Sequence, residues 1–355
     1  MAHASPAAAN RFLGGVRTGL KTAGRAISTR QQRSKSKAFL RWAKFCDEME
    51  VSDTLDTVVD HDTKYLFLIV YGVEYRASGA RGKPVRATTV LDQINAACDE
   101  IIKLGGSDPR RPEYSPEKPP PAEYPVWDEY CQGLRKEDGP PSRAHPVNIT
   151  ILQALITTHN RADPDMGERW SHLLDLAIVA FFWLLRPCEY LFRRTRNADD
   201  GNTTPYELRH IHLTIDGTTY TALTAPLHDS TSIDRIQSAT LQLDDQKNGV
   251  KGESIGHAAT NDPTFCPAKA LGRIAQRHQR YHAANPNDPI PPAKRKIYEH
   301  QGPDGTWHVT ANRHVTAALR KAAQSVEGKT GISHKLISAR SMCPGGATAP
   351  LCAGI

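Results

Sequence analysis

The segment Arg186-Pro187-Cys188-Glu189 holds the first residues whose types and spacing suggest chemistry. It follows Trp183-Leu184-Leu185, the end of a long apolar stretch that predicts a buried helix. Arg186 and Glu189 are three residues apart, so on a helix they share one face and can pair. The pair is either a salt bridge that caps a helix end or a guanidinium positioned to bind a phosphate. The motif alone favours the capping interpretation.

A lysine in a turn is the second candidate. Lys247 lies within Asp245-Gln246-Lys247-Asn248-Gly249, at the end of a stretch rich in β-branched residues. The Asn-Gly pair predicts a hairpin with Lys247 at its tip. A lysine in that place can reach a phosphate or protonate a leaving oxygen, although many lysines in such turns are only solvent-exposed.

Other residue groups argue against common site classes. The seven cysteines are scattered and form no CxxC pair, which indicates neither a disulfide framework nor a structural zinc site. His278 and His282 stand four residues apart, but Gln279 replaces the glutamate of a zinc protease motif. We interpret both as surface histidines on a helix. The glycines before Lys83 lack phosphate-loop spacing and predict a turn, so no metal and no small-molecule cofactor is expected.

The first half of the chain is predicted to be all-helical. Apolar residues at helical spacing predict helices over 36–46, 64–75 and 90–104. Seven prolines between Pro109 and Pro125 predict a long loop, and a short helix follows over 127–135.

The second half mixes helices with a few strands. Alternation and β-branched residues predict strands over 208–215, 219–223 and 239–243, and Asp216-Gly217 predicts the turn between the first two. Helical patterns occupy most of the remainder, at 149–159, 168–185, 267–281, 311–325 and the C-terminus. This half is therefore predicted to be an α+β domain with a small antiparallel sheet.

The excess of positive charge belongs to the N-terminal segment. The residues up to Cys46 include ten basic and no acidic side chains, which leaves 35 basic against 38 acidic residues in the rest of the chain. Such a run is typical of a nucleic-acid-binding arm, a solvated tail or an organelle transit peptide. The basic residues that we predict to bind DNA are Arg30, Arg33, Lys35, Lys37, Arg41 and Lys44.

Three segments together resemble one family, the tyrosine recombinases (phage-integrase-like enzymes that break and rejoin DNA), in the form found in eukaryotic mobile elements. Leu185-Arg186-Pro187-Cys188-Glu189-Tyr190 resembles the first arginine box of this family, and Gln246-Lys247-Asn248-Gly249 resembles its β-hairpin lysine. The segment from Ser338 to Ala349 resembles its His-x-x-Arg box with the following Gly-Gly-Ala. The resemblance runs from about Thr29 to the end of the chain.

The resemblance implies an all-α core-binding (SAM-like) domain followed by a mainly α, α+β catalytic domain with a small antiparallel sheet. We expect a basic, disordered arm over 1–34, the core-binding domain over 35–136, a linker over 137–147, and an incomplete catalytic-like domain over 148–355. In this family two arginines, a lysine and one or two histidines hold the scissile phosphate while a tyrosine attacks it. Fixed cations stabilise the charge that develops on the phosphate oxygens, without metal or nucleotide.

The resemblance assigns the phosphate-binding roles to Arg186 and Lys247, but the third box departs from the family pattern. Arg340 stands where the family has histidine, and Cys343 stands where it has the second arginine. Cysteine cannot contact a phosphate as the two-pronged guanidinium does. Pro350 lies within the helix predicted next, where a proline costs about 3 kcal/mol.

No tyrosine of this sequence follows the third box, where the resemblance places the nucleophile. The last are Tyr281 and Tyr298, which we interpret as packing or surface residues. We therefore expect a DNA-binding protein that resembles the recombinases but is catalytically incomplete. The alternative is a non-catalytic DNA-binding module derived from a mobile element.

The expected partner is double-stranded DNA, and self-association on DNA stays open. A membrane partner is not expected, because the longest apolar stretch, 173–185, contains Asp175 and is shorter than the ~20 residues of a membrane span. The expected location is nuclear or intracellular, with import into an organelle through the basic N-terminus as the alternative.

Overall fold

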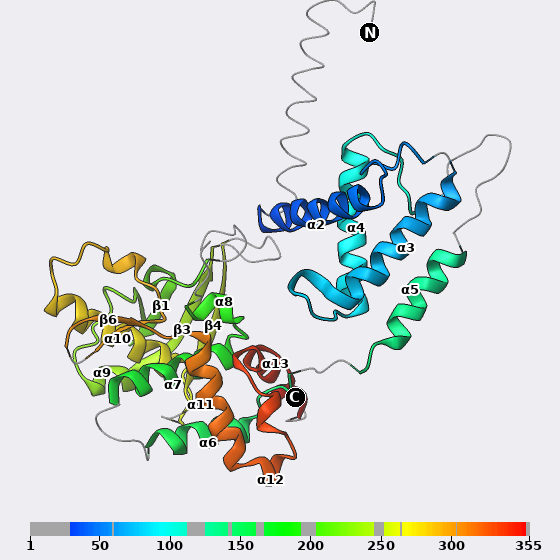
Figure 1. Ribbon diagram of the computed structural model, residues 1–355. Helices are drawn as coiled ribbons and strands as arrows, with labels where there is room; N and C mark the ends of the chain where they lie inside the picture. The colour runs from blue at the N-terminus through cyan, green and yellow to red at the C-terminus, as the bar shows by residue number, and fades with distance from the viewer. Residues whose placement is uncertain are drawn as a thin grey trace, which may run out of the picture. The chain divides into compact units, whose positions relative to one another are not determined.

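The computed structural model describes residues 29–58, 60–111, 125–140, 144–160, 167–192, 204–244, 252–262, 265–302 and 304–352. The chain divides into two compact units, Met1–Pro141 and Ser142–Ile355, and the division falls inside the segment predicted as a linker. The described residues are mostly helical, with one four-stranded antiparallel sheet (Figure 1). The predicted class, mainly helical with a small antiparallel sheet, is confirmed at this level.

The described part of the first unit is built from helices around an aromatic core. Trp42 is fully buried, donates its indole N–H to the carbonyl of Asp53 at 2.7 Å, and packs edge-on against Tyr71. The Gln93 amide donates to the Ala38 carbonyl and to the Tyr71 hydroxyl, each at 2.8 Å. These satisfied polar groups tie three of the helices together. The elements are α2 (Thr29–Glu48), α3 (His61–Ser78), η1 (Gly79–Arg81), α4 (Ala87–Lys103) and α5 (Pro125–Glu137).

Helix α2 begins earlier than the sequence pattern predicts. It starts at Thr29, so it takes in the end of the predicted arm, including Arg30 and Arg33. The sequence here has arginine and glutamine side chains that favour helix, but no apolar residue at helical spacing to reveal it. Residues 1–28 of the predicted arm lie outside the described residues.

The sheet of the second unit is antiparallel, in the order β2-β1-β3-β4. The predicted turn at Asp216-Gly217 is confirmed: both residues have positive φ, 49° and 76°, as a tight two-residue hairpin requires. The sequence analysis did not find the edge strand β4, whose side chains are mostly exposed. The strands are β1 (Ile211–Ile215), β2 (Thr218–Thr221), β3 (Ile236–Leu243) and β4 (Glu253–Ala258).

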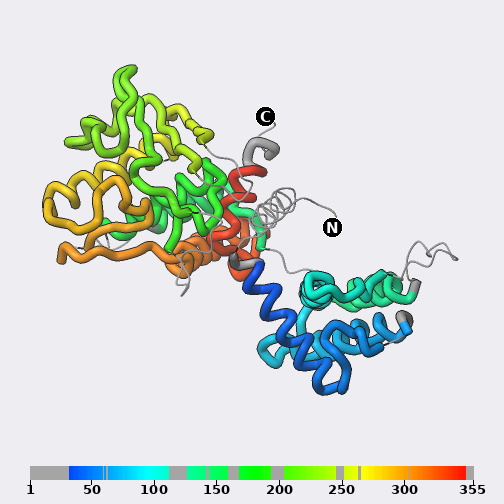
Figure 2. Tube along the Cα trace, turned by 90° about the horizontal axis from the view of Figure 1, so that it is seen from above, coloured from blue at the N-terminus to red at the C-terminus, as the bar shows by residue number. Residues whose placement is uncertain are grey.

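The buried helix α7 (Gly167–Phe182) lies at the centre of this unit, between α10 (Pro267–Ala284) and α13 (Met342–Cys352). Figure 2 shows the red C-terminal helix against the green segment of α7. Asp175, the acidic residue of the apolar stretch, is 1% exposed and accepts from Arg273 and Arg277 of α10 at 2.6–2.8 Å. The two guanidiniums compensate a carboxylate that would otherwise be too costly to bury.

Shorter elements complete the second unit. A two-stranded sheet pairs β5 with β6, and α6 packs against α11. The remaining elements are α6 (Ile149–Asn160), α8 (Pro187–Tyr190), η3 (Leu208–His210), α9 (Ser230–Asp234), η4 (Pro292–Lys294), β5 (Glu299–Gln301), β6 (Trp307–Val309), α11 (Asn312–Ser325), α12 (Glu327–Thr330), η5 (His334–Leu336) and η6 (Ala339–Ser341).

The prediction of two surface histidines on α10 is wrong for one of them. His278 is 3% exposed and stacks on Trp307 of β6, whereas His282, one turn later, is exposed. Both lie on the same helix face, but His282 belongs to the last turn of the helix, beyond the elements that cover His278. Tyr281 and Tyr298 are both buried, as the packing interpretation predicts.

Candidate phosphate-binding site

The end of α7 delivers Arg186 to the surface through a strained turn. The amide of Leu185 donates to the Ala180 carbonyl, and Leu184 has a φ of 55°, a geometry that usually calls for glycine. A leucine in the left-handed region costs about 1 kcal/mol, which the buried neighbours Trp183 and Leu185 offset through their packing. The chain then leaves the core abruptly at Arg186.

Arg186 and Glu189 form the pair that the sequence predicts. Arg186 precedes α8, and its backbone N–H donates to Glu189 Oε2 at 2.6 Å, so the glutamate does cap the helix. The guanidinium is 3.6 Å from Glu189 Oε1 and its side chain is 41% exposed. The capping interpretation is therefore confirmed, and the partly exposed guanidinium leaves the phosphate interpretation open.

Glu189 is a buried carboxylate whose Oε1 has no hydrogen-bond partner among the described residues. Burial raises the pKa of this carboxyl, and the bond from the Arg186 backbone only partly opposes the effect. The Arg186 guanidinium, 3.6 Å away, is too distant to give this oxygen a full hydrogen bond. A further hydrogen-bond donor placed beside the oxygen would therefore be stabilised.

The β3–β4 hairpin is attached to the same end of α7. Trp183 donates its indole N–H to the Ile255 carbonyl of β4 at 2.9 Å, and its ring packs edge-on against His257 with centroids 4.5 Å apart. Strands β3 and β4 are antiparallel, and their pairing runs from Leu243 opposite Glu253 to Ser238 opposite Ala258. Lys247 belongs to the connection between these strands, and residues 245–251 lie outside the described residues.

A histidine that the sequence analysis missed fixes the base of this hairpin. His210 Nδ1 accepts from the Glu207 N–H at 3.0 Å, so its proton is on Nε2, which donates to Asp244 at 2.7 Å. Asp244 is the last described residue before the Lys247 connection. Burial lowers the pKa of His210, so the neutral ring orients Asp244 by hydrogen bonding. No local spacing in the sequence predicts this contact.

The third box begins at η6 and continues into α13, beside Arg186. Both Arg186 and Glu189 act electrostatically on the Cys343 thiol, and burial raises its pKa, which keeps the thiol uncharged near pH 7. Arg340 is exposed and forms no ion pair with a described residue. The residue at the second arginine position thus lies close to the first arginine, but it brings no positive charge.

Two glycines allow α13 to approach the rest of the site. A Cβ on Gly345 would lie 2.1 Å from the Val147 carbonyl oxygen, and one on Gly346 would lie 1.9 Å from that of Phe181. Both contacts are with backbone, which cannot rotate away. The Gly-Gly pair therefore has a physical reason in this fold: it seats the helix that begins at Met342 directly on the end of α7.

Tyr190 links the first and third boxes but is not placed as a nucleophile. Its ring is fully buried, its hydroxyl donates to the Ala339 carbonyl at 3.4 Å, and burial raises its pKa. A phenol in that position is inaccessible to a phosphate and is held in its protonated form. Its role is to fix α8 against η6.

Helix α2 carries the residues predicted to bind DNA, and several are already paired. Lys35 bonds Asp99 at 2.6 Å, Arg41 donates to Gln93 at 3.2 Å, and Lys44 lies 3.2 Å from Glu48. Arg33 and Lys37, four residues apart, are exposed and make no ion pair with a described residue. These two form the accessible basic pair of α2. For Arg30 the helix is described but the side chain is not.

Among the described residues, no cluster of histidine, cysteine or acidic side chains could hold a metal ion. No described helix is both long and apolar enough to cross a membrane. No family model and no curated protein sequence matches the chain. The resemblance to the tyrosine recombinases therefore rests on the residues of the three boxes.

Proposed function

We propose that this chain binds double-stranded DNA in the manner of a tyrosine recombinase, with Arg186 and Lys247 as phosphate ligands, and that its site is catalytically incomplete. The meeting of the first and third boxes carries the proposal: the strained end of α7 exposes Arg186 and receives α13 at Gly346, and Trp183 beside it holds β4, the strand that follows the Lys247 segment.

The incompleteness follows from the chemistry of the residue at position 343. Phosphoryl transfer spreads negative charge over the phosphate oxygens, and catalysis depends on cations fixed around them. The neutral Cys343 thiol leaves the position near Arg186 without the second guanidinium that the resemblance calls for. The proposal is therefore DNA binding without strand exchange. A DNA partner implies a nuclear or other DNA-containing compartment, and self-association on DNA belongs to the same proposal.

Arg186→Gln tests the phosphate role directly. The variant should bind a labelled DNA duplex several-fold more weakly at 0.1 M salt, because one phosphate contact is lost. The slope of log K against log salt should become shallower by about 0.9. Fluorescence anisotropy over a salt series measures both quantities.

Arg280→Gln is the matched control, because Arg280 is exposed and pairs with Glu168 away from the three boxes. It should leave affinity and slope unchanged. Equal slopes for wild type and Arg186→Gln would remove Arg186 from the DNA interface and sink the proposal.

Cys343→Arg should strengthen duplex binding. The new guanidinium would lie near Arg186, where Glu189 Oε1, which accepts no hydrogen bond from a described residue, offers it a partner and limits the repulsion between the two cations. We expect a several-fold gain in affinity and a salt slope steeper by about 0.9. Cys343→Gln, of similar length but uncharged, should behave as wild type. A Cys343→Arg protein that folds, by circular dichroism, yet binds no more tightly would contradict this arrangement.

The alternative function, a non-catalytic DNA-binding module, is favoured by one observation. The exposed pair Arg33 and Lys37 on α2 could contact phosphates without any contribution from the second unit. In that case Arg33→Gln/Lys37→Gln should flatten the salt slope while Arg186→Gln leaves it intact. The two sets of variants therefore separate the two functions.

A further inference from the structure

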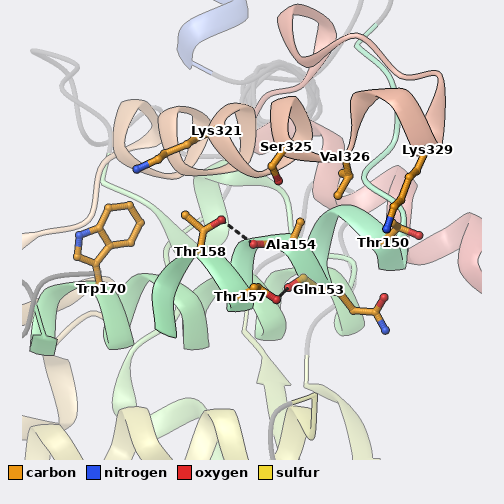
Figure 3. A pocket seen from close by; sticks show the side chains of 10 residues that line it. All are labelled: Thr150, Gln153, Ala154, Thr157, Thr158, Trp170, Lys321, Ser325, Val326 and Lys329. Atoms are coloured by element: carbon orange, nitrogen blue, oxygen red, sulfur yellow. Dashed lines mark hydrogen bonds between the residues drawn. The ribbon is translucent and has the colours of Figure 1, made fainter. Parts of the chain in front are cut away.

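A groove lies between α6 and the α11–α12 segment, on residues that none of the three boxes uses. Its volume is about 660 Å³, within the range of ligand pockets in proteins. Figure 3 shows α11 and α12 along one side and α6 along the other, with Trp170 of α7 at one end. The lining residues are Thr150, Gln153, Ala154, Thr157, Thr158, Trp170, Lys321, Ser325, Val326 and Lys329.

The groove is elongated and cationic at both ends. Lys321 lies above Trp170 at one end, and Lys329 lies above Thr150 at the other (Figure 3). The α6 wall from Thr150 to Thr158 covers eight helical steps, or about 12 Å. The lining includes two lysines and no carboxylate. A ligand that matches this wall is therefore extended and carries negative charge at intervals along its length.

The walls between the lysines offer acceptors more than donors. The hydroxyls of Thr157, Thr158 and Ser325 donate to carbonyls of their own helices, at 3.1, 2.8 and 2.7 Å. Their lone pairs remain directed outward, while their protons are already used. An extended acidic peptide needs donors for its backbone carbonyls, and between the lysines only the Thr150 hydroxyl and the Gln153 amide are left to supply them. A nucleic-acid strand needs cations for its phosphates and acceptors for its base amino and imino groups.

Trp170 supplies a flat apolar surface beside one of the cations. The indole packs partly against the core of the second unit and is half-buried, so one part is held while another faces the groove. An aromatic ring next to a phosphate-binding cation is the arrangement by which proteins stack the bases of single strands.

We propose that the groove between α6 and α11 binds single-stranded nucleic acid, with a base stacked on Trp170 and phosphates at Lys321 and Lys329. The binding is largely independent of sequence, because an aromatic ring stacks on any base and phosphate contacts carry no sequence information. The site does not depend on the duplex-binding function proposed for Arg186, since the two share no residue.

The test uses the full chain and a fluorescein-labelled oligothymidylate of about eight nucleotides, a length within single-strand site sizes. Lys321→Gln/Lys329→Gln should weaken binding about tenfold at 0.1 M salt. It should also make the salt slope shallower by about 1.4, because single strands lose ~0.7 per phosphate contact. Lys294→Gln/Lys335→Gln removes the same charge from exposed lysines outside the groove and should leave both values unchanged.

Trp170 provides the second readout. Trp170→Ala should weaken binding about tenfold, whereas Trp170→Phe, which keeps an aromatic surface and the packing, should stay within about threefold of wild type. The proposal is overturned if the double lysine variant binds the oligonucleotide as tightly as wild type. It is also overturned if a glutamate-rich peptide competes as well as unlabelled oligothymidylate does. Duplex binding should be unaffected by the groove variants, which separates this result from the Arg186 test.

Discussion

The second unit should lose stability steeply as the pH falls below about 6.5, because folding buries three neutral histidines. His172 of α7, His278 of α10 and His300 of β5 are each no more than 3% exposed. The ring centroid of His172 lies 5.1 Å from that of His300 and 6.2 Å from that of His278. None of the six ring nitrogens has a well-formed hydrogen bond to a described residue.

Burial is the main cause that lowers the pKa of each ring, and the mutual repulsion of neighbouring cations adds to it. The pKa falls to about 3 for His278, to about 4 for His300 and well below its usual range for His172. Weak contacts with the backbone of Ile297, Tyr298 and Glu299 oppose the shift only in part. The charged or titratable groups facing the three rings are Arg277 (bound to Asp175), Arg295 (bound to Asp288 and Glu299), Arg169, His308 and Tyr281.

The direction of the pH effect follows from these lowered values. Above pH 6.5 the histidines are neutral in both states, so the stabilisation is complete. Below pH 6.5 the unfolded chain binds protons that the folded unit excludes until the pH nears 4 or 3, so unfolding becomes easier. In this window each histidine lowers the free energy of unfolding by about 1.4 kcal/mol per pH unit. The three together lower it by about 4 kcal/mol per pH unit. Since domains are stable by ~5–15 kcal/mol, the second unit should unfold between pH 5 and 4.

Urea unfolding followed by tryptophan fluorescence at pH 7, 6 and 5 measures this effect. His278→Phe removes one titrating ring and keeps a ring against Trp307, so the loss of stability should be smaller by about 1.4 kcal/mol per pH unit. His282→Phe, on the same helix but exposed, should retain the wild-type pH dependence. Equal pH dependence for wild type and His278→Phe would show that His278 is not kept neutral by folding.

The parts of the fold that the sequence predicts are those decided by local pattern. The helices that form the cores have apolar residues at helical spacing, and Asp216-Gly217 has the residue types that a tight hairpin turn demands. Strand β4 has no such pattern, because its residues from Glu253 to Ala258 are mostly exposed and are held by pairing with β3. Strands β5 and β6 have three residues each, too few for a period to show.

The site was only partly predictable, because the contacts that build it are non-local. The spacing of Arg186 and Glu189 predicts their pairing, and the structure adds that Glu189 caps the backbone. Nothing local indicates that Trp183 holds β4 or that His210 orients Asp244. The charge run on α2 could not reveal that Lys35 is already bound to Asp99, since the partner lies 64 residues away. A count of charges thus overstates how many of them remain for DNA.

Gly346→Ala should be among the most destabilising single changes in the second unit and should also disturb the candidate site. The added methyl would lie 1.9 Å from the Phe181 carbonyl oxygen and 2.6 Å from Leu184 Cδ2, so α13 must move away from α7. We expect a loss of about 3 kcal/mol in urea unfolding at pH 7, the upper range for overpacking. Gly328→Ala is the matched control: a Cβ there meets nothing within 4 Å, so the change should be neutral or slightly stabilising.

Because α13 carries Cys343, the shift should also abolish the gain in duplex binding expected of Cys343→Arg when the two changes are combined. If Gly346→Ala unfolds at the same urea concentration as the control, α13 does not rest on α7 as closely as described, and the meeting of the first and third boxes loses its support.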